Sequence, residues 1–224
     1  MAKRPVVIAF DVIETLFPLE PVRQRLVDAG LPGHLLELWF ARLLRDGFAL
    51  AASDSYRPFG EIAAAALRST AGSPLNDETV QTILAGFAAL DPHPDVKPAI
   101  DLAREAGVRM VTLTNGSAQN TTALLGRAGI DGDIEQVLSV DDVQRWKPAA
   151  EIYRHAANSV QMPPERVALV AAHAWDTHGA HQARLTTGWV ARLEDEFPAI
   201  YAPPDVTGQD LVEVVSGLLD LRPD

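Results

Sequence analysis

The sequence predicts an α/β fold: a doubly wound, Rossmann-like parallel sheet with a helical cap subdomain inserted after its first strand. Three observations indicate this fold. Short apolar, β-branched runs recur along the chain, and their unbroken apolarity is typical of strands covered on both faces. Helical patterns separate most of these runs, which is the order that strand–helix–strand crossovers produce. One long stretch after the first run contains helical patterns alone.

Length and composition set limits on the fold and the function. The chain has 224 residues, of which 47% are hydrophobic and 22% charged, as expected for one globular α/β domain or a domain with a smaller insert. Its formal net charge of −11 argues against nucleic-acid binding and against recruitment to anionic membranes. The absence of cysteine excludes disulfides, cysteine-zinc sites and thiol catalysis. The first apolar stretch is too short for a signal peptide or a membrane span, so we expect a cytoplasmic protein.

Strands are expected where apolar runs end at polar residues. Four clear runs cover residues 6–10, 110–113, 167–170 and 187–190, and a weaker one covers 137–140. Helical patterns occupy 98–106, 118–128 and 211–219. Ser117 precedes the second of these helices as an N-cap, and Gly129 ends it. Thr207, with Asp210 as its capping-box partner, is expected to start the third.

Residues 19–91 interrupt the alternation with helical patterns alone, at 32–52, 59–70 and 76–88. A helical insertion after the first strand is best placed over the carboxyl ends of the strands, where α/β sheets bind their ligands. We therefore predict a core formed by residues 1–18 and 92–224, with residues 19–91 as a helical cap.

Reactive or hydrogen-bonding side chains follow the predicted strands. In chain order they are Asp11, Thr114 with Asn115, Lys147, and His173 with Asp176. Because the carboxyl ends of parallel strands share one edge of a sheet, these side chains are expected to converge on one pocket. A carboxylate, a hydroxyl, an amide, an ammonium and a second carboxylate in one place suit nucleophilic catalysis by an aspartate.

Five segments give the sequence a family resemblance that covers nearly the whole chain. They are FDVIETLF, an LW pair in the predicted cap followed by YRPF, LTNGS, LSVDDVQRWKPAAEIY, and AHAWDTHGA. With these segments in this order, the sequence resembles the haloacid dehalogenase superfamily and, within it, the type II L-2-haloacid dehalogenases. The resemblance implies hydrolysis of an (S)-2-haloacid to an (R)-2-hydroxyacid and halide, with inversion at C2.

The resemblance assigns the central chemistry to three residues. Asp11 would be the nucleophile, whose carboxylate displaces halide from C2 and forms an ester. Asp176 would activate the water that hydrolyses this ester. Lys147 would pair with both carboxylates and keep them ionised near neutral pH.

Supporting roles follow from the same resemblance. Thr15 would hydrogen-bond around the nucleophile, Tyr153 would orient the charged cluster, and Thr114 and Asn115 would hold the substrate carboxylate and the leaving group. An apolar substrate wall, which also forms the seam between cap and core, is expected from Ile13, Trp39, Phe40, Phe59 and Trp175. Read without the family, Thr15 is equally suited to a structural cap. Asp176 also suits the N-terminus of a helix that starts near Thr177, although the catalytic role is favoured.

The sequence departs from the family pattern at five positions. Phe40 stands where an arginine usually helps to remove the halide, and Ile13 replaces an aromatic or polar residue. Glu14 occupies a position where glycine is common, Ala171 replaces a serine, and His173 replaces an asparagine. His173 is a candidate for direct participation, although a lone histidine is more often structural than catalytic.

Other functions remain open at this stage. A related hydrolase that opens the ring of azetidine-2-carboxylate would cleave a C–N bond, and a catalytically silent homologue would only bind a small carboxylate. A magnesium phosphatase ranks last, because Ile13 stands where such enzymes carry a second aspartate. We expect no metal and no cofactor, a small carboxylate substrate, no nucleic-acid or membrane partner, and a homodimer formed through cap helices, which the resemblance suggests.

Overall fold

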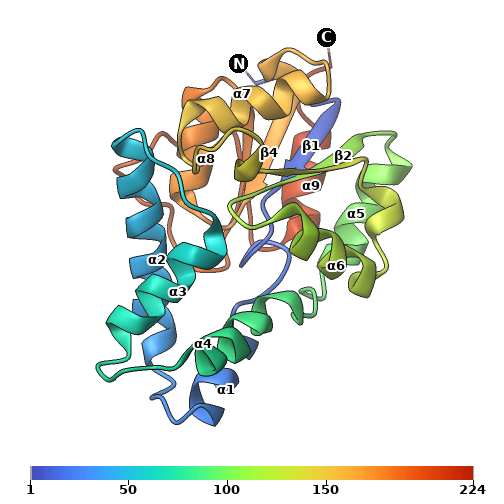
Figure 1. The fold of residues 1–224 in the computed structure, drawn as a ribbon. Helices are drawn as coiled ribbons and strands as arrows, with labels where there is room; N and C mark the ends of the chain where they lie inside the picture. Colours follow the sequence, from blue (N-terminus) through green and yellow to red (C-terminus); the bar gives the residue numbers. More distant parts are fainter. Residues whose placement is uncertain (1, 224) are drawn as a thin grey trace.

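The computed structural model describes residues 2–223 and has a six-stranded sheet at its centre (Figure 1). The strand order is β3-β2-β1-β4-β5-β6, and neighbouring strands are all parallel. The strands are β1 (Val7–Phe10), β2 (Arg109–Thr114), β3 (Gln136–Ser139), β4 (Val167–Ala171), β5 (Thr186–Val190) and β6 (Val206–Gly208). The predicted doubly wound α/β fold is therefore confirmed, because the chain builds the sheet outward from β1 on one side and then on the other.

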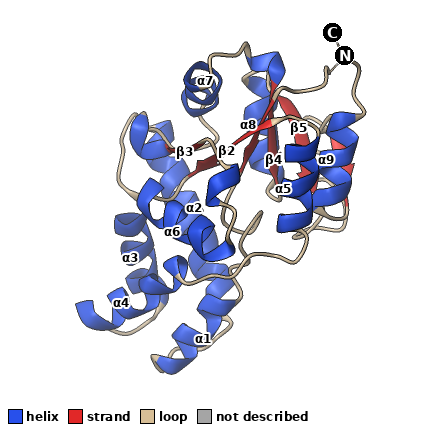
Figure 2. Ribbon diagram, turned by 90° about the vertical axis from the view of Figure 1, so that its right-hand side faces the viewer, coloured by secondary structure: helices blue, strands red, loops and turns tan. Residues whose placement is uncertain are grey.

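Helices cover both faces of the sheet (Figure 2). On one face α5 packs against α9, and on the other α7 packs against α8. These core helices are α5 (Val96–Glu105), α6 (Ala118–Ala128), α7 (Ala150–Ser159), α8 (Ala174–Gln182) and α9 (Leu211–Leu219), with short 3-10 helices at Asp131–Asp133, Val140–Asp142 and Pro164–Arg166. All residues of β1, β4 and β5 are buried, which explains why the sequences of β1 and β4 are apolar without alternation.

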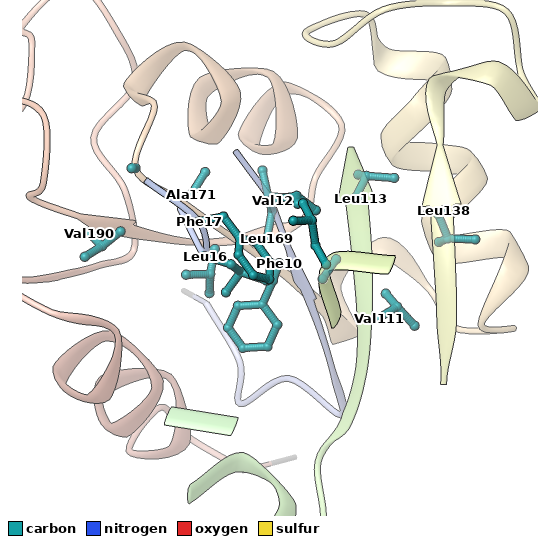
Figure 3. Packing of buried hydrophobic residues seen from close by; sticks show 14 of the residues in the cluster. Phe10, Val12, Leu16, Phe17, Val111, Leu113, Leu138, Leu169, Ala171 and Val190 are labelled. Carbon is teal, nitrogen blue, oxygen red and sulfur yellow. The ribbon is translucent and has the colours of Figure 1, made fainter. Parts of the chain in front are cut away.

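Buried side chains fix the segment that follows the central strand β1. Figure 3 shows Phe10 of β1 beside Leu169 of β4, with Leu16 and Phe17 from the segment that follows β1 in the same cluster. Phe10, Leu16 and Phe17 are fully buried. The short segment between them, which includes Asp11, is therefore anchored by core packing on either side.

The structure corrects two expectations about the sheet and its helices. The five predicted strands are confirmed to within one or two residues, but the edge strand β6 was not predicted, because Val206 is its only large apolar residue. Ser117 caps α6 as predicted, accepting a hydrogen bond from the Asn120 backbone. Thr207 does not cap α9: it lies in β6, and Asp210 is the N-cap, accepting from the Glu213 backbone N–H at 2.8 Å.

The stretch between β1 and β2 is helical, as predicted, and lies to one side of the sheet (Figure 1). Its helices are α1 (Pro21–Asp28), α2 (Leu35–Ala52), α3 (Phe59–Thr70), α4 (Asp77–Leu84) and a 3-10 helix at Ala85–Ala88. The short helix α1, which buries only Val22 and Leu26, was not predicted. Within residues 2–223 no helix has the length and apolarity that a membrane crossing needs.

Trp146 joins this helical unit to the sheet. Its indole N–H donates to the carbonyl of Arg57 at 3.0 Å, and its ring stacks on Phe59 with the ring planes 8° apart. Gly47 of α2 lies against the same ring, so closely that a Cβ atom there would overlap it. Because Lys147 is the next residue in the chain, this contact also fixes the backbone from which the Lys147 side chain starts.

Candidate active site

Two adjacent strands at the middle of the sheet bring distant segments together. β1 and β4 are neighbours, and the connections that follow them lead to opposite sides of the sheet, a place where doubly wound folds bind ligands. Asp11 directly follows β1, and its backbone N–H donates to the Val170 carbonyl of β4 at 3.0 Å. His173 follows β4 as the N-cap of α8. Both residues therefore lie at the carboxyl edge of the sheet.

The ammonium of Lys147 lies between two carboxylates. Its Nζ donates to Asp11 Oδ1 at 3.0 Å and to Asp176 Oδ2 at 2.7 Å. The side chains of Lys147 and Asp176 are fully buried, and that of Asp11 is 10% exposed. A buried ion without a partner costs several kcal/mol, so these two carboxylates are what allows a charged lysine inside the protein.

Burial and charge separate the pKa values of the two carboxyl groups. Burial raises the pKa of Asp11, but Lys147, His173 and a hydrogen bond from Thr15 together outweigh it and hold this pKa well below its usual range. For Asp176, burial is the largest effect, and together with the charge of Asp11 it outweighs Lys147, so the pKa is raised. Lys147 favours ionisation of both groups, as we expected, but at Asp176 burial and the charge of Asp11 outweigh its effect. Carboxyl groups shifted in opposite directions suit different roles, one as a nucleophile and one as a proton acceptor.

Thr15 and Tyr153 hold these two carboxylates in place. Thr15 Oγ1 donates to Asp11 Oδ2 at 2.6 Å and accepts from the backbone N–H of Ala172 at 2.9 Å, so it links the segment after β1 to the end of β4. The Tyr153 hydroxyl is buried and donates to Asp176 Oδ1 at 2.5 Å. Burial, followed by the charge of Asp176, raises the pKa of Tyr153 well above its usual value.

Asp176 is not the N-cap of the helix that follows β4, which was one of the two roles that the sequence suggested for it. α8 begins at Ala174, not near Thr177, and His173 is its N-cap. Asp176 lies in the first turn of the helix, and its carboxylate is bound by side chains from other segments rather than by the start of α8. A negative charge in the first turn also interacts favourably with the helix dipole.

Thr114 is the last residue of β2 and Asn115 follows it, on the other side of Asp11. The side-chain carbonyl of Asn115 accepts from the Lys147 backbone N–H at 3.0 Å, and Thr114 Oγ1 accepts from the Gly116 N–H at 2.9 Å. With its oxygen engaged, Asn115 is left with its amide hydrogens as donors. Both residues are buried and line the small cavity beside Asp11.

This inner cavity has a volume of about 20 Å³. It is lined by Asp11, Ile13, Phe40, Leu44, Phe59, Thr114, Asn115, Gly116, His173 and Trp175. A volume of this size holds roughly one water molecule, so wall side chains must move to admit an organic acid. The cavity is not lined by Lys147, Asp176, Tyr153 or Thr15. Instead, Lys147 and Thr15 hydrogen-bond to Asp11, and Lys147 and Tyr153 hydrogen-bond to Asp176.

Trp39 is the one predicted wall residue that the structure places elsewhere. Its indole N–H donates to the Ala63 carbonyl at 2.9 Å, and its ring makes an edge contact with Phe87. It is 1% exposed and packs inside the helical unit rather than along the cavity. The next residue, Phe40, does line the cavity.

Glu14 contacts His173 at the rim of the same cavity, and sequence reasoning did not predict this contact. The Nε2 atom of His173 is 2.9 Å from Glu14 Oε2, and its Nδ1 is 3.6 Å from Asp11 Oδ2. Burial lowers the pKa of His173, but the nearby carboxylates of Asp11 and Glu14 outweigh burial and raise it to about 9. At neutral pH His173 is therefore an imidazolium.

An outer cavity of about 660 Å³ adjoins the inner one and shares Phe40, Leu44 and His173 with it. Its other lining residues are Glu14, Pro18, Leu19, Glu20, Arg23, Leu36, Glu37, Ala41, His93, Arg192, Leu193 and Glu194. Phe40 and His173 thus stand between the small cavity beside Asp11 and a larger, partly apolar approach. Across residues 2–223, no group of three or more histidine or carboxylate side chains is arranged to hold a metal ion.

Comparison with known proteins places this arrangement in a family context. A family model described as haloacid dehalogenase-like hydrolase matches residues 6–184. An (S)-2-haloacid dehalogenase of Pseudomonas sp. (strain YL) is 29% identical over 204 residues, covering 88% of each chain. One from Pseudomonas putida is 26% identical and covers 95% of this chain and 96% of its own length.

Solved structures show the same likeness in three dimensions. A crystal structure of an L-2-haloacid dehalogenase, RSc1362, superposes with a TM-score of 0.89 at 27% identity, covering 97% of this chain and 99% of that one. The L-2-haloacid dehalogenase of Xanthobacter autotrophicus with chloropropionic acid covalently bound superposes with a TM-score of 0.87 at 20% identity, over 95% of this chain and 97% of that one. The second likeness is to the fold.

Proposed function

The chain belongs to the haloacid dehalogenase-like hydrolases, and from that membership we propose that it hydrolyses (S)-2-haloacids to (R)-2-hydroxyacids through an ester on Asp11. The observation that carries the proposal is the buried Lys147 between Asp11 and Asp176, two carboxyl groups whose pKa values are shifted in opposite directions. A site that only bound a carboxylic acid would gain nothing from burying two further negative charges beside it.

The first step is displacement at carbon. An oxygen of Asp11 forms a bond to C2 of the substrate while the bond from C2 to the halogen breaks and its electron pair leaves with the halide. Lys147 and Thr15 hold the carboxylate in position, and the depressed pKa of Asp11 keeps it ionised across the neutral range. The configuration at C2 inverts here.

The second step restores the enzyme. Water adds to the carbonyl carbon of the Asp11 ester, and Asp176 accepts a proton from that water. The bond between this carbon and the ester oxygen then breaks, and the second proton of the water passes to the departing oxygen. This releases the 2-hydroxyacid and leaves Asp11 as a carboxylate. C2 takes no part in this step, so the inversion is retained in the product. Tyr153 holds Asp176 toward Lys147 throughout.

The Asp176→Asn variant tests this sequence of steps, because it should permit alkylation and block hydrolysis. With 2-bromopropionate we expect a burst of at most one bromide per active site. The intact protein should gain the mass of one propionate group, and peptide mapping should locate the group on Asp11. Asp11→Asn is the matched control and should give neither bromide nor adduct.

Two results would contradict the proposal. Steady turnover by Asp176→Asn without an adduct would assign the water to another base, and an adduct elsewhere would reject Asp11 as the nucleophile. The wild-type protein should be assayed in parallel with 2-chloro-, 2-bromo- and 2-fluoroacids, azetidine-2-carboxylate and a phosphate ester, each with and without EDTA. Phosphate release that needs magnesium, or ring opening without halide release, would replace the proposed reaction.

Two further parts of the proposal concern the whole chain. Residues 19–91 form the cap over the site, as Phe40 and Phe59 of this stretch in the cavity wall support. The protein forms a homodimer through cap helices, which is supported by exposed apolar side chains there, Val27 on α1 and Leu38 on α2.

A further inference from the structure

The imidazolium of His173 is the cationic group that faces the inner cavity. Of the described residues that line this cavity, only Asp11 and His173 are ionisable. The Nδ1 atom of His173 is buried and has no hydrogen-bond partner within residues 2–223, whereas Nε2 is engaged by Glu14 at 2.9 Å. The ring lies against Trp175 and Phe40, with centroids 5.1 and 6.3 Å away.

Displacement at C2 moves a negative charge across this cavity. Before the step the charge is on Asp11, where Lys147 and Thr15 already bind the carboxylate oxygens. After the step it is on the departing halide, and Asp11 is a neutral ester. Lys147 is held by two carboxylates and does not line the cavity, and the other walls are apolar or neutral. His173 Nδ1 is 3.6 Å from Asp11 Oδ2, where the path of the charge begins, and His173 lines the cavity that the halide must enter.

Resting on the proposed function, we propose that His173 is the catalytic residue that donates a hydrogen bond from Nδ1 to the departing halide, that Glu14 positions it, and that this favours fluoride as the leaving group. The bond from Asp11 to C2 forms as the bond to fluorine breaks, and fluoride leaves with the electron pair. The proton stays on His173. The proton lost from water in the second step passes through Asp176 to solvent, so the net products are hydroxyacid, fluoride and one proton.

Fluoride suits this site because of its charge density. It is the smallest halide and holds its charge in the smallest volume, so a charged N–H donor stabilises it more than it stabilises bromide.

The charges around His173 set the pH range in which it can act. Asp11 and Glu14 contact its ring, while Lys147 and Asp176 lie beyond Asp11. Arg192, His93 and Glu194 line the outer cavity, and no hydrogen bond or ion pair joins them to His173 in the described chain. With a pKa of about 9, His173 loses its proton at alkaline pH, and fluoride release should fall there.

His173→Asn and Glu14→Gln test the inference against a matched control, His181→Asn, which makes the same change on the exposed side of α8. The measurement is kcat/KM for 2-fluoropropionate and for 2-bromopropionate across pH 6–10. We expect His173→Asn to lose roughly 100-fold or more with the fluoro acid and less than about tenfold with the bromo acid, as removal of one charge-stabilising donor predicts. Glu14→Gln should move the alkaline fall in fluoride release to lower pH, and His181→Asn should change nothing.

Three results would overturn the inference. The first is an equal loss of kcat/KM with the fluoro and bromo acids in His173→Asn. The second is an alkaline fall in fluoride release that occurs at the same pH in Glu14→Gln as in the wild type. The third is wild-type protein that releases bromide but no fluoride. If circular dichroism shows that His173→Asn is unfolded, the pH profile of Glu14→Gln alone tests the inference. The adduct on Asp11 in Asp176→Asn distinguishes the two proposals: if it forms with the bromo acid while any of these results holds, only the role of His173 fails.

Discussion

Glu14 holds a backbone conformation that is unfavourable for a residue with a side chain. Its φ of +67° lies in the left-handed region, which costs a residue other than glycine roughly 1–2 kcal/mol. The contact of its carboxylate with His173 supplies a reason for keeping a side chain there. Sequence analysis identified both residues as departures from a family pattern but could not pair them, because 159 positions separate them and no periodicity connects the two segments.

His173 should make the stability of the protein depend on pH above neutrality. Its pKa is about 9 in the folded protein and near 6.5 when unfolded, so folding favours the protonated form. This contribution is complete below about pH 6.5 and is lost as the pH rises through 9, a decrease of about 3 kcal/mol in the free energy of unfolding. Asp11, whose folded pKa is lowered, contributes in the opposite direction and only at acidic pH.

Urea unfolding at pH 6.5 and pH 9.5 measures this decrease. The His173→Asn variant should unfold with a nearly constant free energy over the same range, because the group that titrates has been removed. A wild-type free energy of unfolding that stays flat between these pH values would show that the folded protein does not favour the imidazolium.

At the scale of elements, the contact between α2 and the core should be sensitive to one added methyl group. Gly47→Ala would place a Cβ atom inside the ring of Trp146, and we expect a loss of about 1–3 kcal/mol in stability together with reduced activity. Gly126→Ala in α6 is the matched control. Its Cβ would meet no atom within 4 Å, so it should stabilise the protein by about 0.4–1 kcal/mol. Thermal unfolding of both variants checks this, and equal effects would mean that the Trp146 contact does not constrain α2.

The elements with strong local sequence patterns could be predicted, and those with weak patterns could not. α6 was predicted at both of its ends, because Ser117 and Gly129 are strong helix-end residues. β6 and α1 are short and have few apolar residues, so their formation depends on the neighbours they pack against rather than on local sequence. In the same way, the strand ends predicted that Asp11, Lys147 and Asp176 converge, whereas Trp39 carried no signal that its side chain faces away from the cavity.

At the scale of the molecule, the proposed homodimer predicts a solution mass of twice the 24.2 kDa of one chain. Leu38→Glu places a charge on an apolar side chain that is 44% exposed on α2, and it should convert the dimer to a monomer. Ile200→Glu is the control, since Ile200 is more exposed, at 83%, but lies outside the cap helices. Light scattering during gel filtration measures both, and a wild-type protein with the mass of one chain would contradict the dimer.

The central place of β1 in the sheet also bears on how the protein is synthesised. β1 leaves the ribosome first with Asp11 at its end, but its two neighbours in the sheet are β2 and β4, and β4 is made only after three quarters of the chain. Lys147 precedes β4 in the chain, whereas His173 and Asp176 follow it. Under the proposed mechanism, a nascent chain that stops before β4 carries an aspartate that is neither oriented nor charge-paired, so it is not trapped as an ester that it lacks the means to hydrolyse. The proposed mechanism thus predicts that both half-reactions are acquired together, once the chain extends past Asp176.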